Sequence, residues 1–163
     1  MSGGPVHLRP QRLVYVRMTG PYETSVPKAW SKLLGWVERA GMASLVASWY
    51  GLARDNPYQV AHDQCRYDAC VPVDPMFEDR ALRELGLTTL PGGPHERHKH
   101  IGGYADVIAR LGAFYSTHAP QNGLQFDLRR PIVTVYFSDP RQTDEAKPRA
   151  DLCVPLQSVK AAA

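Results

Sequence analysis

Along the first half of the chain, the spacing of the apolar residues changes from a strand-like to a helical pattern and then back to a strand-like one. The stretch RLVYVRM, residues 12–18, is rich in β-branched and aromatic side chains, which favours a strand. The apolar residues that follow recur at helical spacing, which predicts a helix with Ser25 as N-cap, Pro27 in its first turn and Gly41 at its end. The predicted elements are a strand at 12–18, a helix at 25–41, and strands at 44–53 and 66–73.

The second half of the chain repeats this order of patterns. Between the halves, residues 77–85 predict a short helix, and TTLPGGP at residues 88–94 predicts a loop because of its glycines and prolines. Each half therefore has the pattern strand, helix, strand, strand (βαββ). The elements predicted for the second half are a strand at 95–101, a helix at 104–117, and strands at 132–137 and 150–156.

Two short phrases recur in the two halves. RYDACVP at residues 66–72 returns as RADLCVP at 149–155, 83 positions later, and GPY at 20–22 returns as GGY at 102–104, 82 positions later. These matches indicate an internal duplication. A three-stranded unit with one helix cannot bury both faces of its sheet, so we expect the two units to share one sheet around a pseudo-two-fold axis, with a cleft where they meet.

The predicted fold class is therefore α+β, with two pseudo-symmetric βαββ modules that form a mainly antiparallel sheet with a central ligand groove. Repeat 1 spans about 12–73 and repeat 2 about 94–156. Cys70 and Cys153 occupy matching strand positions, where we expect small buried residues. Asp68 and Asp151 lie in the same matched strands, where we expect ion pairs at the edge of the sheet or polar groups that face a turn.

Composition narrows the function classes. At 163 residues, 44% hydrophobic and 21% charged, the chain is expected to form one domain. No apolar run approaches the roughly 18 residues of a membrane span, and the first residues lack the apolar core of a signal peptide, so we expect a cytoplasmic protein without membrane contact. The net charge of +3 comes without a cluster of Lys and Arg, which argues against direct nucleic-acid contact. Three cysteines, an odd number, predict reduced thiols.

The stretch HERHKH, residues 95–100, raises the question of a metal site. On a strand, His98 and His100 share one face and His95 lies on the other. Zinc sites need converging ligands and usually have paired close spacings, and the sequence contains neither CxxC nor HExxH. We therefore expect exposed polar residues here, and we predict no metal and no cofactor.

The order of these motifs resembles the GyrI-like small-molecule-binding superfamily. The resemblance covers residues 8–157 and rests on GPY, GLARDNP, RYDACVPV, PIVTVYFSDP and RADLCVPL in that order. Its members include the DNA gyrase inhibitory protein and the effector-binding domains of AraC-type and BmrR-type regulators. The resemblance implies two βαββ modules side by side and a central groove for drug-like molecules, often cationic and aromatic.

The resemblance also implies three roles: a sensor domain attached to a DNA-binding helix-turn-helix, a free-standing binding protein, or a hydrolase of cyclopropane-containing genotoxins. No helix-turn-helix precedes residue 12, so we expect a free-standing member or a sensor domain separated from a longer regulator. The expected partner of the chain is a small molecule. The sequence leaves open whether the chain also pairs with a second copy of itself or is fused to a DNA-binding domain.

One position departs from the superfamily pattern. Where the superfamily carries a groove carboxylate that pairs with cations, PIVTVYFSDP places Thr134, whose hydroxyl can hydrogen-bond but carries no charge. Glu96 is our candidate for a replacement carboxylate.

Strand alternation then selects the candidate groove residues. Thr134 and Tyr136 share a face, and the offset of 83 places Trp49 and Gly51 on the matching face of the other module. If that face borders the groove, Trp49 and Tyr136 would form aromatic walls and Gly51 would leave room, the alternative being that Trp49 packs in the core. The predicted ligand-binding residues are Tyr22, Trp49, Gly51, Glu96, Tyr104, Thr134 and Tyr136.

Four further aromatic residues are assigned from their places in the elements. Tyr22 and Tyr104 follow the first strand of each half, where they either approach the groove or cap a turn. Trp30 fits the buried stripe of its helix, so we expect it in the core. Trp36 lies off the centre of that stripe and would border the cleft or be half exposed.

The predicted function is binding of amphipathic, aromatic, drug-like molecules, cations among them, by a sensor or a sequestering protein. Binding needs no catalytic residue, and none is assigned. One alternative is a hydrolase of a reactive cyclopropane-type toxin, for which Tyr22, Tyr104 and Glu96 are the acid-base candidates. The other is a protein-interaction module that resembles a gyrase inhibitor.

Overall fold

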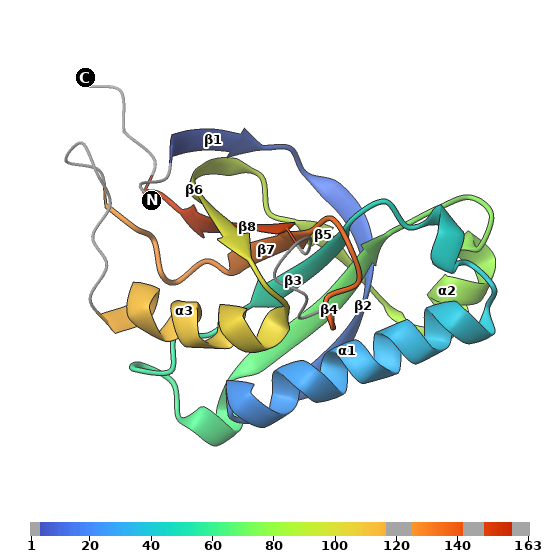
Figure 1. The fold of residues 1–163 in the computed structure, drawn as a ribbon, viewed down its shortest axis with the longest axis horizontal. Coiled ribbons are helices and arrows are strands. Elements are labelled where there is room, and N and C mark those ends of the chain that lie inside the picture. Colours follow the sequence, from blue (N-terminus) through green and yellow to red (C-terminus); the bar gives the residue numbers. More distant parts are fainter. Residues whose placement is uncertain (1–3, 117–124, 142–148, 158–163) are drawn as a thin grey trace.

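A computed structural model describes residues 4–116, 125–141 and 149–157, which form one antiparallel sheet and three α-helices (Figure 1). The strand order in the sheet is β1-β6-β8-β7-β3-β4-β2-β5. The predicted α+β fold class is thereby confirmed. The strands are β1 (Gly4–Leu8), β2 (Gln11–Thr19), β3 (Trp49–Ala53), β4 (Arg66–Pro72), β5 (Gly86–Leu90), β6 (Gly93–Ile101), β7 (Ile132–Tyr136) and β8 (Arg149–Pro155); the helices are α1 (Tyr22–Arg39), α2 (Glu78–Glu84) and α3 (Tyr104–Ser116).

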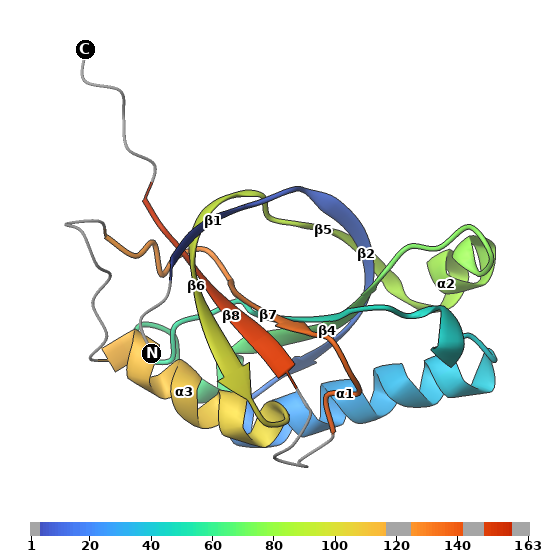
Figure 2. The ribbon, with the colours of Figure 1, turned by 45° about the horizontal axis from the view of Figure 1, so that its top comes forward.

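The sheet curls into a half-barrel, and α1 and α3 cover its outer face (Figure 2). The short helix α2 lies beside the C-terminal end of α1 in both views (Figures 1 and 2). In the part of the chain that the structure describes, none of the helices combines the length and the apolar character needed to cross a bilayer.

The helix α1 begins three residues earlier than the sequence predicts. Gly20 has a φ of 144°, a conformation that favours glycine, and Pro21 follows as the N-cap with a φ of −53°. The amide of Ser25 donates to the carbonyl of Pro21, so Ser25 lies inside the first turn, where its side chain is buried. The prediction of Ser25 as N-cap was therefore wrong.

Three other strand predictions also differ from the structure. Residues 88–94, predicted as a loop, belong mostly to β5 and β6, and β1 was not predicted at all. The predicted strand at 44–53 is shorter, because residues 43–45 form a 3-10 turn and β3 begins at Trp49. Glycine and proline weakened the strand signal at these places, but edge strands tolerate both because one side of each is not in the ladder.

These unpredicted strands complete the half-barrel. The segment β1–β2 pairs with β5–β6 in one antiparallel register, in which Gly4 faces Arg97 and Tyr15 faces Gly86, with a bend at residues 9–10 and 91–92. Each of these long segments also pairs with an inner strand, β2 with β4 and β6 with β8. The curvature therefore follows from two bent ribbons that pair with each other.

The pairing follows the predicted pseudo-symmetry. Gly51 faces Thr134, which lies 83 positions later, and Trp49 faces Tyr136. Adding 82 or 83 to the residue numbers converts the β2–β4 ladder into the β6–β8 ladder, and the β3–β4 ladder into the β7–β8 ladder. A pseudo-two-fold axis therefore passes between Gly51 and Thr134, while the exact ends of the two repeats stay a prediction.

The inner face of the curled sheet carries a second, smaller core. Cys70 and Cys153 lie there, both buried as predicted, together with Leu52 and Val133. Burial is the main cause that raises the pKa of both thiols, so both are protonated at neutral pH. These two cysteines therefore act as small apolar residues of the core.

Asp68 also lies on this inner face. Its side chain is fully buried, and both of its carboxylate oxygens accept from Arg17, at 2.7 and 3.0 Å, while Arg54 donates to one of them. The prediction of an ion pair holds, but its place at an edge or a turn was wrong, because β4 has neighbours on both sides. Asp151, its counterpart, is half-buried opposite Lys99.

Buried histidines in β6 make the stability depend on pH. His95 has no exposed surface, and its pKa is lowered chiefly by burial and further by the nearby Arg130 and His7, against an opposing hydrogen bond to the Gly93 carbonyl. Burial and Arg110 likewise lower the pKa of His100. Because the folded pKa lies below the unfolded value of about 6.5, this contribution to stability is present above that pH and is lost as the pH falls.

We expect the urea midpoint of unfolding to decrease between about pH 7.5 and pH 5, above the range in which carboxylates titrate. His95→Gln should reduce this decrease, and His100→Gln should reduce it further. His62→Gln, at an exposed position, is the matched control. An unchanged pH profile in His95→Gln would show that His95 does not carry the effect.

Candidate functional site

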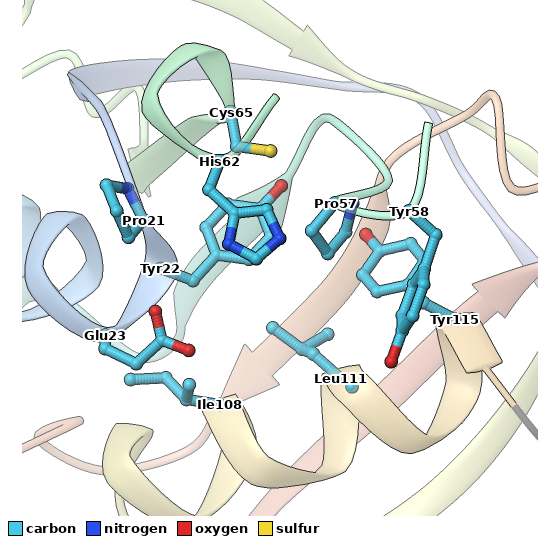
Figure 3. A pocket seen from close by; sticks show the side chains of 11 residues that line it. Pro21, Tyr22, Glu23, Pro57, Tyr58, His62, Cys65, Ile108, Leu111 and Tyr115 are labelled. Atoms are coloured by element: carbon cyan, nitrogen blue, oxygen red, sulfur yellow. The ribbon is translucent and has the colours of Figure 1, made fainter. Parts of the chain in front are cut away.

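A pocket lies on the helix-covered side of the molecule, where the N-terminal end of α1 approaches α3 and the loop before β4 (Figure 3). Its volume is about 200 Å³. Three segments that are distant in the sequence therefore build one concave surface. The lining residues are Pro21, Tyr22, Glu23, Pro57, Tyr58, His62, Cys65, Ile108, Leu111, Gly112 and Tyr115.

Tyr22 is the first residue of α1 and forms one wall of the pocket. Its hydroxyl donates to the carbonyl of Asp55 and accepts from the Asp55 amide at 3.0 Å. Burial raises its pKa, so the hydroxyl is neutral at physiological pH. Tyr22 is thus both a pocket wall and the anchor of the neighbouring loop, which combines the two roles that the sequence left open.

The loop after β3 presents Tyr58 at the rim. The Asn56 side chain accepts from the amide of Tyr58 at 2.9 Å, and Asp55 binds the guanidinium of Arg66 at 2.8 and 2.9 Å. These bonds hold the loop in one conformation, while 67% of Tyr58 remains exposed. An ordered, exposed aromatic ring beside a pocket is available for contact with a ligand.

Helix α3 supplies the opposite wall. Leu111 and Tyr115 are buried, and the Tyr115 hydroxyl donates to the carbonyl of Ala53 at 3.4 Å. Between them, a Cβ atom at Gly112 would meet no heavy atom within 4 Å. The pocket is therefore open at the point where the helix carries no side chain.

The polar groups of the pocket are a carboxylate, an imidazole and a thiol. Glu23 and His62 are exposed, and Figure 3 shows the Glu23 carboxylate between Tyr22 and Ile108. The Cys65 thiol is buried and lies 3.7 Å from the carbonyl of Val60, and its pKa is raised first by burial and then by Asp55 and Asp63.

The buried hydroxyls and the thiol are poorly suited to act as a base or a nucleophile. A nucleophilic thiol or a tyrosine base requires a lowered pKa, whereas burial raises the pKa of Tyr22, Cys65 and Tyr115. Glu23 would place a negative charge at the mouth of a pocket whose walls are aromatic and aliphatic. Such a combination suits an amphipathic ligand with a positive charge.

Of the seven predicted site residues, Tyr22 alone lines this pocket. Four others, Trp49, Gly51, Thr134 and Tyr136, do lie together on β3 and β7, as strand alternation predicts. They are buried beneath α1, and Trp30 packs against Trp49 and Tyr136 with ring centroids 6.3 and 5.4 Å apart. Trp30 has no exposed surface, which confirms its prediction as a core residue.

The remaining two predicted residues lie in the second module, away from the pocket. Tyr104 begins α3, is half-buried, and its amide donates to the carbonyl of Pro140 at 2.9 Å. Glu96 is buried under α3, where its carboxylate lies 2.7 Å from Nε2 of His98. Glu96 is not among the residues that line the pocket, so it adds no charge there.

Two further expectations need correction. Trp36 is only 7% exposed, because it packs on Phe77 and donates its indole N–H to Glu84, so it is not half exposed. The histidines of HERHKH, expected to be exposed, are buried. Within the described ranges, His, Cys, Asp and Glu form no group of three that could hold a metal.

Sequence reasoning missed Glu23, Tyr58 and Tyr115. A single helix wheel or strand pattern ranks residues by burial and contains no signal for a pocket between segments. The one available hint was Tyr58, an aromatic residue directly after the turn DNP, where turns usually expose their side chains.

A family model and several known proteins match most of the chain. A family model described as the GyrI-like small molecule binding domain matches residues 6–157. A DNA gyrase inhibitor from Cronobacter sakazakii is 30% identical over 154 residues, which cover 93% of this chain and 94% of the relative. A DNA gyrase inhibitor from Serratia proteamaculans is 27% identical over 152 residues, which cover 92% of each.

Solved structures with low sequence identity share the fold. The C-terminal domain of EcmrR matches with a TM-score of 0.60 and 12% identity, over 96% of this chain and 98% of that one. SAV2435 bound to tetraphenylphosphonium gives 0.58 and 11%, over 96% and 94%. A hydrolase encoded by lin2189 from Listeria innocua gives 0.60 and 15%, over 96% and 92%. At such identities these likenesses establish the fold alone.

Proposed function

This chain belongs to the GyrI-like small molecule binding domain family, and we propose that its pocket between α1 and α3 binds a compact aromatic cation. The family membership confirms the resemblance inferred from the sequence. The observation that carries the proposal is the composition of the pocket, in which Tyr22, Tyr58 and Tyr115 surround a space bordered by the Glu23 carboxylate.

The physical basis is burial of apolar surface combined with charge. Transfer of a ring into the pocket gains about 25 cal/mol per Å² of apolar area removed from water. A cation over a tyrosine face gains about 0.5–2 kcal/mol, more as water is excluded. A volume of about 200 Å³ is below the usual range for drug-sized ligands, so the preferred ligand is a single ring with a small cationic group.

One structural neighbour supports this ligand class, and another supports the proposed role. SAV2435 is described as bound to tetraphenylphosphonium, an aromatic cation. EcmrR forms a complex with DNA in another structure, so a GyrI-like fold occurs within a DNA-binding protein. We propose the role of a sensor or of a sequestering protein for the present chain, and its cytoplasmic location stays a prediction from composition.

Calorimetric titration of the full chain with benzyltrimethylammonium tests the proposal. We expect saturable binding with one ligand per chain, and up to about fivefold weaker binding in Glu23→Gln, since an exposed charge contact contributes up to about 1 kcal/mol. Glu38→Gln is the matched control, because Glu38 is an exposed carboxylate on the same helix, far along from the pocket.

The absence of saturable binding in the unmodified protein would refute the proposed function. Equal weakening by Glu23→Gln and Glu38→Gln would refute the role of Glu23, because it would show an effect of net charge alone. Higher salt should weaken binding to the unmodified protein and to Glu38→Gln, but much less to Glu23→Gln, since it screens the charge of Glu23.

The names of the curated relatives make inhibition of DNA gyrase the second candidate function. A supercoiling assay with purified gyrase distinguishes this function from ligand binding. Inhibition that persists in Glu23→Gln would assign it to a surface other than the pocket. Hydrolysis of a reactive toxin has less support in the pocket, where the buried hydroxyls and the thiol have raised pKa values.

A further inference from the structure

A second pocket lies near the C-terminal end of α1, between the 3-10 turn at residues 43–45 and the segment that follows β4. Its volume is about 210 Å³, and it shares no lining residue with the pocket between α1 and α3. The lining is mostly apolar, with one carboxylate. Its walls include Leu45, Ala47, Tyr50, Val73, Asp74 and Phe77.

The pseudo-two-fold axis relates this pocket to a place in the second module. At the offset of 83 that relates β4 to β8, Val73 corresponds to Leu156. The amide of Val73 donates to the carbonyl of Arg12 at 3.1 Å, and the amide of Leu156 donates to the carbonyl of Pro94 at 3.0 Å. Arg12 and Pro94 stand 82 positions apart, as the equivalent residues of β2 and β6 do. The backbone is therefore alike at the two places.

An arginine fills the equivalent place in the second module. Arg130 is half-buried, and its guanidinium donates to the carbonyl of Leu156 at 3.4 Å and to the carbonyl of Gly92 at 2.7 Å. The residue 83 positions earlier is Ala47, which is exposed and ends in a methyl group. The first module thus has a pocket where the second module has a guanidinium and its stem.

The first module also carries a negative charge at this place. Asp74 corresponds to Gln157, which has a neutral side chain. One oxygen of the half-buried Asp74 carboxylate accepts from the amide of Met76 at 2.8 Å, and across the described ranges no cationic side chain forms an ion pair with it. A carboxylate of this kind beside an apolar space favours a positively charged guest.

We propose that this second pocket binds a small molecule with a guanidinium group on an aliphatic stem, in the place that the Arg130 side chain occupies in the other module. The planar fork of a guanidinium matches a carboxylate through two parallel hydrogen bonds. Its stem would lie along Leu45 and Phe77, as arginine stems cover apolar surface. This site is separate from the pocket between α1 and α3 and does not rest on the proposed function.

Calorimetric titration of the full chain with butylguanidinium tests the proposal. We expect saturable binding with one ligand per chain. Butylammonium has the same charge and the same stem but no planar fork, so it should bind about tenfold more weakly, as expected for one lost hydrogen bond. Equal affinities for the two cations would overturn the choice of a guanidinium.

Asp74→Asn tests the charge contact. The Asn oxygen can still accept from the amide of Met76, so the turn is kept while the charge is removed. Binding of butylguanidinium should become up to about fivefold weaker, the size of an exposed charge contact. Asp63→Asn, at an exposed position outside the pocket, is the matched control, and equal weakening in both variants would overturn the role of Asp74.

Ala47→Arg tests the location, because it supplies the missing side chain from the chain itself. We expect this variant to lose the binding of butylguanidinium and to have a raised melting temperature, since the new guanidinium meets the Asp74 carboxylate. Ala43→Arg adds the same charge at an exposed position of the same turn, outside the pocket, and should bind as the unmodified protein does. Equal binding in Ala47→Arg and Ala43→Arg would place the ligand elsewhere and overturn the proposal.

An arginine of a partner protein carries the same head group as the proposed ligand. N-acetylarginine amide presents that head group on a peptide backbone, and we expect it to bind no more tightly than butylguanidinium. Clearly tighter binding would overturn the choice of a free small molecule. Benzyltrimethylammonium is titrated separately, so the loss of either binding event rejects one proposal and leaves the other standing.

Discussion

Replacing Asp68 with alanine should lower the free energy of unfolding by about 3–5 kcal/mol, because it leaves buried charge without its partner. Arg17 donates to both carboxylate oxygens of Asp68, and Arg54 donates to one of them. The Arg54 side chain is only 18% exposed and that of Arg17 is 34% exposed, while Asp68 has no exposed surface. Without the carboxylate, two guanidinium groups would face each other at the inner face of the sheet.

Urea denaturation monitored by tryptophan fluorescence measures this loss. The matched control is Glu78→Ala, which breaks an ion pair with Arg12 whose side chains are 56% and 34% exposed. Pairs of this kind contribute up to about 1 kcal/mol, since water screens them. Equal losses in the two variants would show that burial of Asp68 does not strengthen its pairing.

The second large effect is expected at Gly51, where alanine should lower the free energy of unfolding by about 1–3 kcal/mol through overpacking. A Cβ atom there would lie 2.0 Å from the Tyr67 hydroxyl and 3.5 Å from the Trp30 ring. The Tyr67 ring has no room to withdraw, because it is buried against Tyr22 and Trp30. The space that the sequence suggested for a ligand is thus filled by these rings.

A double-mutant cycle with Tyr67→Phe tests the cause. Removal of the hydroxyl should recover part of the loss, because the nearest remaining atom, the ring carbon Cζ, is 3.0 Å away. Gly112→Ala is the control, since it adds the same methyl group inside a helix, where open space and helix propensity predict a neutral or stabilising effect of up to about 1 kcal/mol. Strict additivity in the cycle would reject the clash with the Tyr67 hydroxyl.

Trp30 and its counterpart Gly112 suggest how a duplicated chain becomes asymmetric. Two copies of one module place equal residues on either side of an axis, and a single large side chain at the axis forces its counterpart to be small. Trp30 and Gly112, each eight residues after the tyrosine that begins its helix, satisfy this requirement, so one module fills the centre and the other leaves an opening. The open space beside Gly112, which borders the pocket between α1 and α3, follows from this asymmetry.

The sequence alone determined the modules and their faces. Strand alternation put Trp49, Gly51, Thr134 and Tyr136 on one face, and the repeated phrases implied the pseudo-symmetry. These features depend on local periods and on self-similarity, which a single sequence contains. The apolar stripe of α1 likewise identified Trp30 as a core residue.

Only the tertiary structure decided what that face packs against and where the pocket lies. The strands β1 and β5 and the pairing of Asp68 with Arg17 depend on partners more than 50 positions away, so no local pattern reports them. The same holds for the pocket, whose walls come from α1, α3 and the loop at Tyr58. A burial pattern in the sequence indicates only that a position faces inward. Whether the space at that position holds a ligand or another side chain, as the Tyr67 ring fills the space at Gly51, depends on distances that arise only when distant segments pack together.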